Sequence, residues 1–283
     1  EMLRSLVGSE MCIRDRFSNV LFKGVGRHPK TGKKKGGIKV HTVIHANEGV
    51  PSDIKFTSAA TNDSFMLKPT TLHKGDIMAM DRAYIDYEKF QQLTERGVVY
   101  VTKMKKSLKY TILSDVMYQT PDGLTEERIQ TVEFVKQKKD GETIRHKARM
   151  ISYCDEKKRK LISLLTNDME SDPDEIIAIY HQRWEIELLF KQMKQNFPLK
   201  YFYGESANAI KIQIWVTLIA NLLLMVMQKG LKRSWSFSGL ATMVRITLMY
   251  YVDFYSLFNN PEKDWEILLE EASGEPPQPS LFD

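Results

Sequence analysis

The stretch IMAMDRAYIDYEKFQQLTERGVVYVT, residues 77–102, places a helix-like segment between two short apolar runs. The first run, 77–80, follows a Gly–Asp turn signal and is typical of a buried strand. A helix is expected over 86–96 and a second strand over 98–102. This order predicts a βαβ unit with parallel strands. Asp81 directly follows the first strand, at the carboxyl end where open α/β sheets usually carry their sites.

The segments on either side of this unit predict a mixed α/β fold interrupted by an all-β insertion. Alternating residues in 38–45 and 54–57, joined by a turn at 47–49, indicate an antiparallel pair of strands. From 109 to 165 the pattern changes to short strands and turns. Helices resume at Asp172 and continue into the C-terminal part of the chain.

The composition indicates a globular chain with a substantial core. The 283 residues are 42% hydrophobic and 10% aromatic, which is enough to fill one. Two cysteines, Cys12 and Cys154, exclude a disulfide framework and a zinc ribbon, and they favour a reducing cytosol. The apolar run 214–227 is interrupted by Asn221 and is shorter than the ~20 residues that a bilayer requires. We therefore expect a buried helix there and no association with membranes.

Positive charge is concentrated in one glycine-rich segment, although the net charge of the chain is only +5. Residues 23–39 contain seven Lys or Arg and no acid. Lys33, Lys34 and Lys35, at its centre, are candidates for binding the phosphate backbone of DNA. A solvated hairpin tip is an equally good interpretation. Residues 261–283 carry seven acids and one lysine, and are expected to form a frayed tail.

A helix that begins at Asp172 has an apolar edge beside a charged one. The segment Asp172–Glu175 supplies an N-cap, a proline at the first helical position and a capping-box glutamate. At ~100° per residue, two neighbouring edges follow: Ile179, Ile186, Phe190 and Met193 on one, and Tyr180, Arg183, Glu187 and Lys194 on the other. A carboxylate beside phosphate-binding cations suggests a divalent ion that bridges acid and phosphodiester. Ordinary surface pairs are the alternative.

Two motifs resemble those of a known family. The spacing Tyr180-x2-Arg183-x3-Glu187-x6-Lys194 resembles the Y-R-E-K signature of the DDE transposases of the insertion-sequence-four group. The segment Met80–Tyr84 resembles the part of that family that carries its second acid. The resemblance runs from Phe17 to about Asn221 and implies an RNase H-like catalytic fold, with the β insertion before the glutamate helix.

The same resemblance implies the chemistry of the site. Two aspartates and one glutamate would hold two Mg²⁺ or Mn²⁺ ions, which cut DNA at insertion-sequence ends and join those ends to a target. Asp81 and Glu187 would be catalytic metal ligands. Three residues would grip the transposon end: Arg183 and Lys194 at phosphates, and Tyr180 through a hydrogen bond. Trp184 would stack on an unpaired base, or else pack in the core.

The partners implied are the terminal inverted repeats and the target DNA, bound by a homodimer on paired ends. The resemblance also implies that the protein is located in the bacterial cytoplasm, and at the nucleoid when it is bound to DNA. Three lysines after the second strand either contact DNA or form a solvated face: Lys103, Lys105 and Lys106.

The first aspartate of the family pattern is missing from its expected place, upstream of Phe17. Residues 5–16 read SLVGSEMCIRDR there, which resembles a translated sequencing-adapter sequence. Glu10 is near the expected register and Asp15 is the only aspartate in the run, but either would be a ligand by coincidence. We therefore expect a truncated chain with little or no catalysis of its own, in which residues 1–16 are not native.

These expectations divide the chain into segments and leave rival functions open. The segments are an artefact (1–16), a first RNase H-like part (17–108), a β-rich insertion (109–165), a second RNase H-like part with the glutamate helix (166–230), and a helical C-terminal segment with an acidic tail (231–283). The rivals are a metal-dependent nuclease, a non-catalytic DNA-binding remnant, and a structural domain with no role on nucleic acid.

Overall fold

The computed structural model describes residues 4–13, 38–58, 61, 63–119, 126–138, 141–155, 159–199, 202–204, 206–248 and 254–259. The chain folds as two compact units. Unit 1 comprises residues 1–191 and 199–211, and unit 2 comprises residues 192–198 and 212–283. These units divide the chain at other positions than the segments expected from the sequence. The segment boundaries at 165 and 230 stay predictions.

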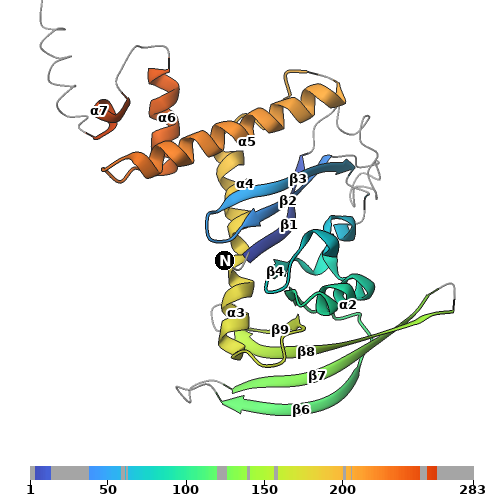
Figure 1. The fold of residues 1–283 in the computed structure, drawn as a ribbon. Coiled ribbons are helices and arrows are strands. Elements are labelled where there is room, and N and C mark those ends of the chain that lie inside the picture. The colour runs from blue at the N-terminus through green and yellow to red at the C-terminus, as the bar shows by residue number, and fades with distance from the viewer. Residues whose placement is uncertain are drawn as a thin grey trace, which may run out of the picture. The chain divides into compact units, whose positions relative to one another are not determined.

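One mixed sheet in unit 1 contains the described strands (Figure 1). In chain order they are β1 (Arg4–Ile13), β2 (Ile38–His45), β3 (Val50–Ser58), β4 (Ile77–Met80), β5 (Val99–Lys103), β6 (Thr111–Gln119), β7 (Glu126–Gln137), β8 (Thr143–Asp155) and β9 (Lys160–Thr166). Their order across the sheet is β3-β2-β1-β4-β5-β9-β8-β7-β6. β4 is parallel to both β1 and β5, whereas β2 is antiparallel to β1 and β3. This is the mixed α/β class predicted from the sequence, and it is consistent with an RNase H-like fold.

The βαβ unit predicted at residues 77–102 is confirmed. β4 and β5 are parallel neighbours, and α2 (Tyr87–Glu95) lies between them in the chain. Asp86 caps α2, because its carboxylate accepts a hydrogen bond from the Glu88 amide at 3.2 Å. Gly97 follows the helix with a φ of 69°, in the left-handed region that favours glycine.

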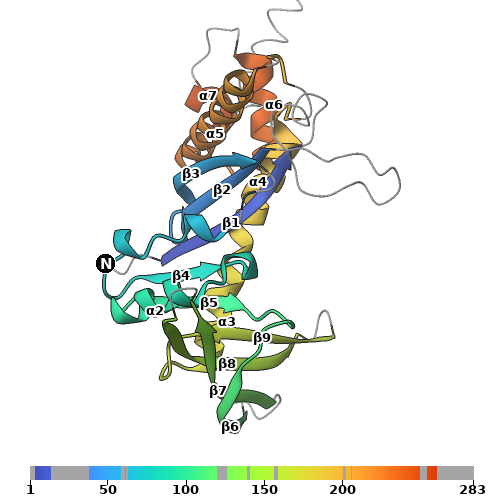
Figure 2. The same cartoon turned by 90° about the vertical axis from the view of Figure 1, so that its right-hand side faces the viewer.

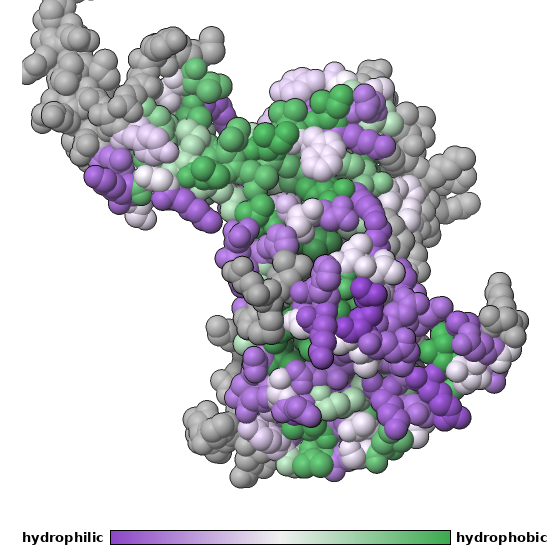
Figure 3. Space-filling model, in the orientation of Figure 1, coloured by the Kyte–Doolittle hydropathy of each residue, from purple (hydrophilic) through white to green (hydrophobic). Residues whose placement is uncertain are grey.

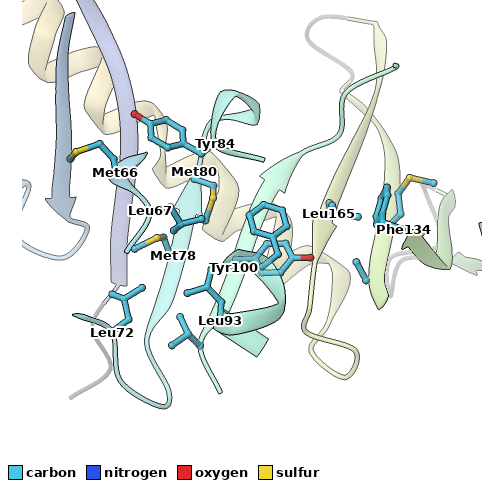
Figure 4. Packing of buried hydrophobic residues seen from close by; sticks show 14 of the residues in the cluster. Met66, Leu67, Leu72, Met78, Met80, Tyr84, Leu93, Tyr100, Phe134 and Leu165 are labelled. Atoms are coloured by element: carbon cyan, nitrogen blue, oxygen red, sulfur yellow. The ribbon is translucent and has the colours of Figure 1, made fainter. Parts of the chain in front are cut away.

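The core of unit 1 forms where α2 packs on the sheet. Phe90 of α2 stacks on Tyr100 of β5 with ring centroids 4.0 Å apart, and both side chains are fully buried. Met78 and Met80 of β4 belong to the same cluster, as does Leu93 of α2 (Figure 4). Burying a side chain of this size contributes about 1.5–3 kcal/mol. This packing fixes β4, and with it the position of the residue that follows the strand.

Strands β6 to β9 occupy the region predicted to be an all-β insertion. β9 pairs antiparallel with β5, so these strands continue the main sheet beyond its parallel part (Figure 2). At the opposite side of β4, residues within the expected artefact form β1. The foreign origin of residues 1–16 stays a prediction.

The helix predicted from Asp172 onward is two helices, α3 (Pro173–Gln182) and α4 (Trp184–Asn196). The N-cap prediction is confirmed, because the Asp172 carboxylate accepts a hydrogen bond from the Asp174 amide at 2.9 Å. The expectation of one continuous helix is wrong. The break falls at Arg183, whose amide donates to the Tyr180 carbonyl at 3.1 Å, a tighter turn than the α-helical pattern of four residues.

Unit 2 is helical. It includes α5 (Ala207–Gly230) from residue 212 onward, α6 (Phe237–Thr247) and α7 (Phe254–Asn259). Leu224 of α5, Leu240 of α6 and Phe258 of α7 form a small buried cluster. The Trp235 indole donates a hydrogen bond to the Phe258 carbonyl at 2.8 Å, which ties α7 to the segment before α6.

The helix α5 is buried on one face only, so the prediction of a buried helix is half right. The buried face includes Ile214, Leu218, Asn221 and Leu224. A row of apolar side chains is more than half exposed, and Figure 3 shows apolar surface over this helix: Ile212, Val216, Ile219, Leu223 and Val226. By length and composition alone α5 could cross a membrane, but a single such helix is weak grounds for a span.

Candidate active site

Asp81 lies where β4 ends, and the turn that follows holds its carboxylate. Oδ1 accepts a hydrogen bond from the Ala83 amide at 2.8 Å, which caps the short 3-10 helix η3 (Arg82–Tyr84). The second oxygen, Oδ2, lies 4.0 Å from Nη1 of Arg183. The side chain is 36% exposed, so a ligand can reach the carboxylate from solvent.

Arg183 joins the two acids that the sequence singled out. Its Nη2 donates a hydrogen bond to Glu187 Oε1 at 2.5 Å, and its Nη1 faces Asp81. The guanidinium carbon also lies 5.6 Å from the centre of the Tyr180 ring. The structure therefore brings together Asp81, Tyr180, Arg183 and Glu187, although more than a hundred residues separate the first from the last.

The Arg183 guanidinium is buried with part of its hydrogen-bonding capacity unused. The side chain is 10% exposed, and Nε and Nη1 form no hydrogen bond to any residue in the described part of the chain. A buried donor without an acceptor costs about 1–3 kcal/mol. An oxyanion bound beside Asp81 would accept from these groups, as phosphate oxygens commonly do from arginine.

Burial keeps Tyr180 protonated, and the groups around Arg183 keep the guanidinium cationic. Burial is the largest influence on the pKa of Tyr180 and raises it; Asp81 also raises it, whereas Arg183 opposes the change. Burial alone would lower the pKa of Arg183, but the hydrogen bond to Glu187 and the nearby Tyr180 and Asp81 together raise it. At neutral pH the site thus offers a guanidinium and a phenol O–H to an anionic ligand.

Asp81 and Glu187, the two carboxylates that share Arg183, supply only part of a magnesium site. Mg²⁺ is usually held by one or two carboxylates together with substrate oxygens, and Asp81 and Glu187 can supply these. Across the described residues, no group of three or more His, Cys, Asp or Glu side chains could hold a metal ion. The parallel register pairs Val7 with Met80, so the next position, Gly8, lies beside Asp81. Glu10, which the sequence placed near this register, is two residues further on.

The other predicted site residues are Trp184, Lys194 and the lysines at 33–35. Trp184 opens α4 and is 52% exposed, which excludes the core-packing alternative. Lys194 is exposed on the part of α4 that belongs to unit 2. Lys33, Lys34 and Lys35 lie outside the described residues. DNA binding by these five residues stays a prediction.

A buried polar network under the Asp81 turn has no signal in the sequence. His41 lies on β2, and its Nδ1 is 3.3 Å from the Tyr84 hydroxyl at the end of η3. Its Nε2 is 2.7 Å from the Thr57 hydroxyl on β3. Burial lowers the pKa of His41 to about 4, so the ring is neutral and makes one donor and one acceptor contact. These contacts join residues far apart in the chain, and only the fold reveals them.

Comparison with known proteins shows which family this chain matches. A family model described as "Transposase DDE domain" matches residues 18–223. The chain is 26% identical over 199 residues to the candidate transposase y4zB of Sinorhizobium fredii, covering 70% of this chain and 55% of that protein. It is 26% identical over 194 residues to the transposase assigned to insertion sequence element IS5377 of Geobacillus stearothermophilus, covering 68% and 49%.

A third relative is the candidate transposase of insertion sequence element IS4SA of Synechocystis sp., which is 25% identical over 191 residues and covers 66% of this chain and 52% of that protein. The chain spans about half the length of the relatives that it matches.

Proposed function

Because the chain belongs to the family of transposases with a DDE domain, we propose that the intact protein cuts DNA at insertion-sequence ends and joins those ends to a target. Asp81 and Glu187 are the proposed catalytic residues and metal ligands. The observation that carries the proposal is their shared partner, since Arg183 is within ion-pair distance of both carboxylates. The spacing of Tyr180, Arg183 and Glu187 supports membership of the insertion-sequence-four group.

Each side chain of the site has a part in this proposal. A bound Mg²⁺ or Mn²⁺ would activate a water or a 3′-hydroxyl and stabilise the leaving oxygen. Arg183 uses Nε and Nη1, which have no acceptor among the described residues, to bind a phosphate of the scissile strand. Tyr180 donates a hydrogen bond from its O–H to an oxygen of the transposon end. The Ala83 amide holds Oδ1 of Asp81 in place, and Oδ2 is the oxygen proposed to bind the metal.

We propose that other residues bind the DNA outside this centre, either through positive charge or by stacking on a base. Trp184 stacks on an unpaired base at the cut end, consistent with its 52% exposure. The cations expected to follow the phosphate backbone are Lys33, Lys34, Lys35 and Lys194. The intact protein works as a homodimer on paired terminal repeats, in the cytoplasm and at the nucleoid when bound to DNA.

We also propose that the intact protein has an aspartate at the position of Gly8, where native sequence would replace residues 1–16. The register that places Gly8 beside Asp81 supports this. The chain as written would then lack one ligand and show little catalysis. A non-catalytic DNA-binding remnant is the second candidate function, and the lack of a third acid among the described residues favours it.

A cleavage assay tests the proposal. The substrate is a supercoiled plasmid that carries the DNA ends flanking the gene in its source. We expect the Gly8→Asp chain to nick it with Mn²⁺, the unaltered chain to nick it far more slowly, and Gly8→Asp with Glu187→Gln to be inactive. Gly8→Asp with Glu185→Gln is the control, because Glu185 is exposed on the same helix. Equal nicking with and without Glu187 would refute the assignment of the site, and DNA binding without nicking by every variant would favour the remnant.

A further inference from the structure

Lys103 ends β5, directly beside the acid that follows β4. The parallel register pairs Met80 with Thr102, so the next pair of positions is Asp81 and Lys103. Neighbouring strands lie about 4.8 Å apart, and a lysine side chain spans more than that distance. The ammonium group of Lys103 is therefore within reach of any ligand bound at the Asp81 carboxylate.

Both residues lie on the face of the sheet that carries the site. Side chains alternate between the two faces of a sheet. Met78, Met80 and Tyr100 belong to the core cluster with Phe90 and Leu93 of α2, as Figure 4 shows for all but Phe90. Positions 79, 81, 101 and 103 must then face the opposite side. There α3 packs on β4 and β5, and Arg183 follows the last residue of α3.

We propose that Lys103 is a further phosphate-binding residue of this site, which holds the DNA backbone on the side of Asp81 away from β1. This rests on the proposed function. Arg183 faces Asp81 from the helices, and Lys103 lies beside it on the neighbouring strand. Lysine acts as a point charge on a long flexible stem, which suits a backbone phosphate whose position varies with the DNA. Lys103 is partly exposed, so DNA can reach it.

The alternative role for Lys103 is structural, as a counter-ion within the protein. The two roles predict different effects when Lys103 is replaced by methionine, a neutral side chain of similar length. A phosphate contact contributes about 0.9 to the slope of log affinity against log salt concentration, whereas a counter-ion within the protein contributes nothing to that slope. The loss of a counter-ion lowers the melting temperature of the free protein instead.

The experiment measures DNA binding by the full chain at several salt concentrations. Fluorescence anisotropy with a labelled 30-base-pair duplex gives the salt slope for the unaltered chain, Lys103→Met, Lys103→Arg and Lys147→Met. Lys147 is the matched control, an exposed lysine on β8 of the same sheet. We expect Lys103→Met to bind more weakly with a slope lower by about 0.9, and Lys103→Arg and Lys147→Met to keep the original slope.

Two failures can be told apart. If the unaltered chain binds DNA and Lys103→Met keeps its slope, the inference about Lys103 is wrong and the proposed function stands. If the unaltered chain shows no salt-dependent binding, the proposed DNA-binding function fails and the role of Lys103 fails with it. Melting temperatures measured on the same samples show whether each variant is folded.

Discussion

Replacement of Arg183 by methionine tests whether this buried cation holds the two acids together. The charged hydrogen bond to Glu187, at 2.5 Å, is worth about 1.5–3 kcal/mol when buried. The pair with Asp81 is 4.0 Å long and Asp81 is 36% exposed, so it adds less than about 1 kcal/mol. Nε and Nη1 have no acceptor among the described residues, so their removal offsets part of the loss. We expect a net destabilisation of about 1–2 kcal/mol.

Urea denaturation of unit 1 measures this loss. The chain has four tryptophans, and replacing Trp215, Trp235 and Trp265 by phenylalanine leaves Trp184 as the reporter, next to the altered residue. Arg183→Lys is the control, since it keeps the charge but loses the planar fork, and we expect it to lose about half as much stability. An unchanged urea midpoint in Arg183→Met would refute the idea that Arg183 stabilises the pair of acids.

Three further predictions concern single residues. Trp184→Ala should weaken binding to a duplex with an unpaired end by about 1–3 kcal/mol while leaving blunt duplex unaffected, and equal losses on both would contradict stacking on a base. His41 has a pKa lowered to about 4 by burial, so the unfolded chain binds more protons between its ordinary pKa of 6.5 and 4; the stability contributed by this group is complete above pH 6.5 and falls as the pH drops towards 4. His41→Gln should flatten that fall in urea midpoints measured from pH 7 to 4.5, and an unaltered pH profile would refute the role of His41. Burial, Asp174 and Asp172 raise the pKa of Glu127 to about 7, although Arg149 lowers it. The folded chain therefore binds more protons than the unfolded chain between pH 4.5 and 7, and the stability contributed by Glu127 falls as the pH rises through this range. Glu127→Gln should have a higher urea midpoint than the unaltered chain at pH 8.

The sequence predicts those parts of the fold whose signals are local. The apolar run before Asp81, the cap at Asp86 and the glycine after α2 lie within one stretch of chain, so the βαβ unit follows from them. The N-cap at Asp172 is likewise written in four consecutive residues. The break at Arg183 has no such signal, because neither proline nor glycine is near it. The contact of the buried guanidinium with Asp81 belongs to tertiary structure, because it joins the end of α3 to the residue that follows β4.

Long-range pairing limits what the sequence predicts about the site. Helical spacing placed Tyr180, Arg183 and Glu187 on one edge, but it did not place Asp81 beside them, because that contact crosses from sheet to helix. The pairing of β9 with β5 depends on strands far apart in the chain. The exposed row on α5 was missed for another reason, since a helix that is apolar on all sides gives no amphipathic pattern to separate a buried face from an open one.

A manganese titration of the full chain, followed by calorimetry, tests the central claim that Asp81 and Glu187 belong to one metal site. We expect weak binding by the unaltered chain and a loss of affinity of about tenfold or more in Asp81→Asn and in Glu187→Gln, with little further loss in the double variant. Glu185→Gln should bind as the unaltered chain does. Binding that survives unchanged in both single variants would contradict the claim.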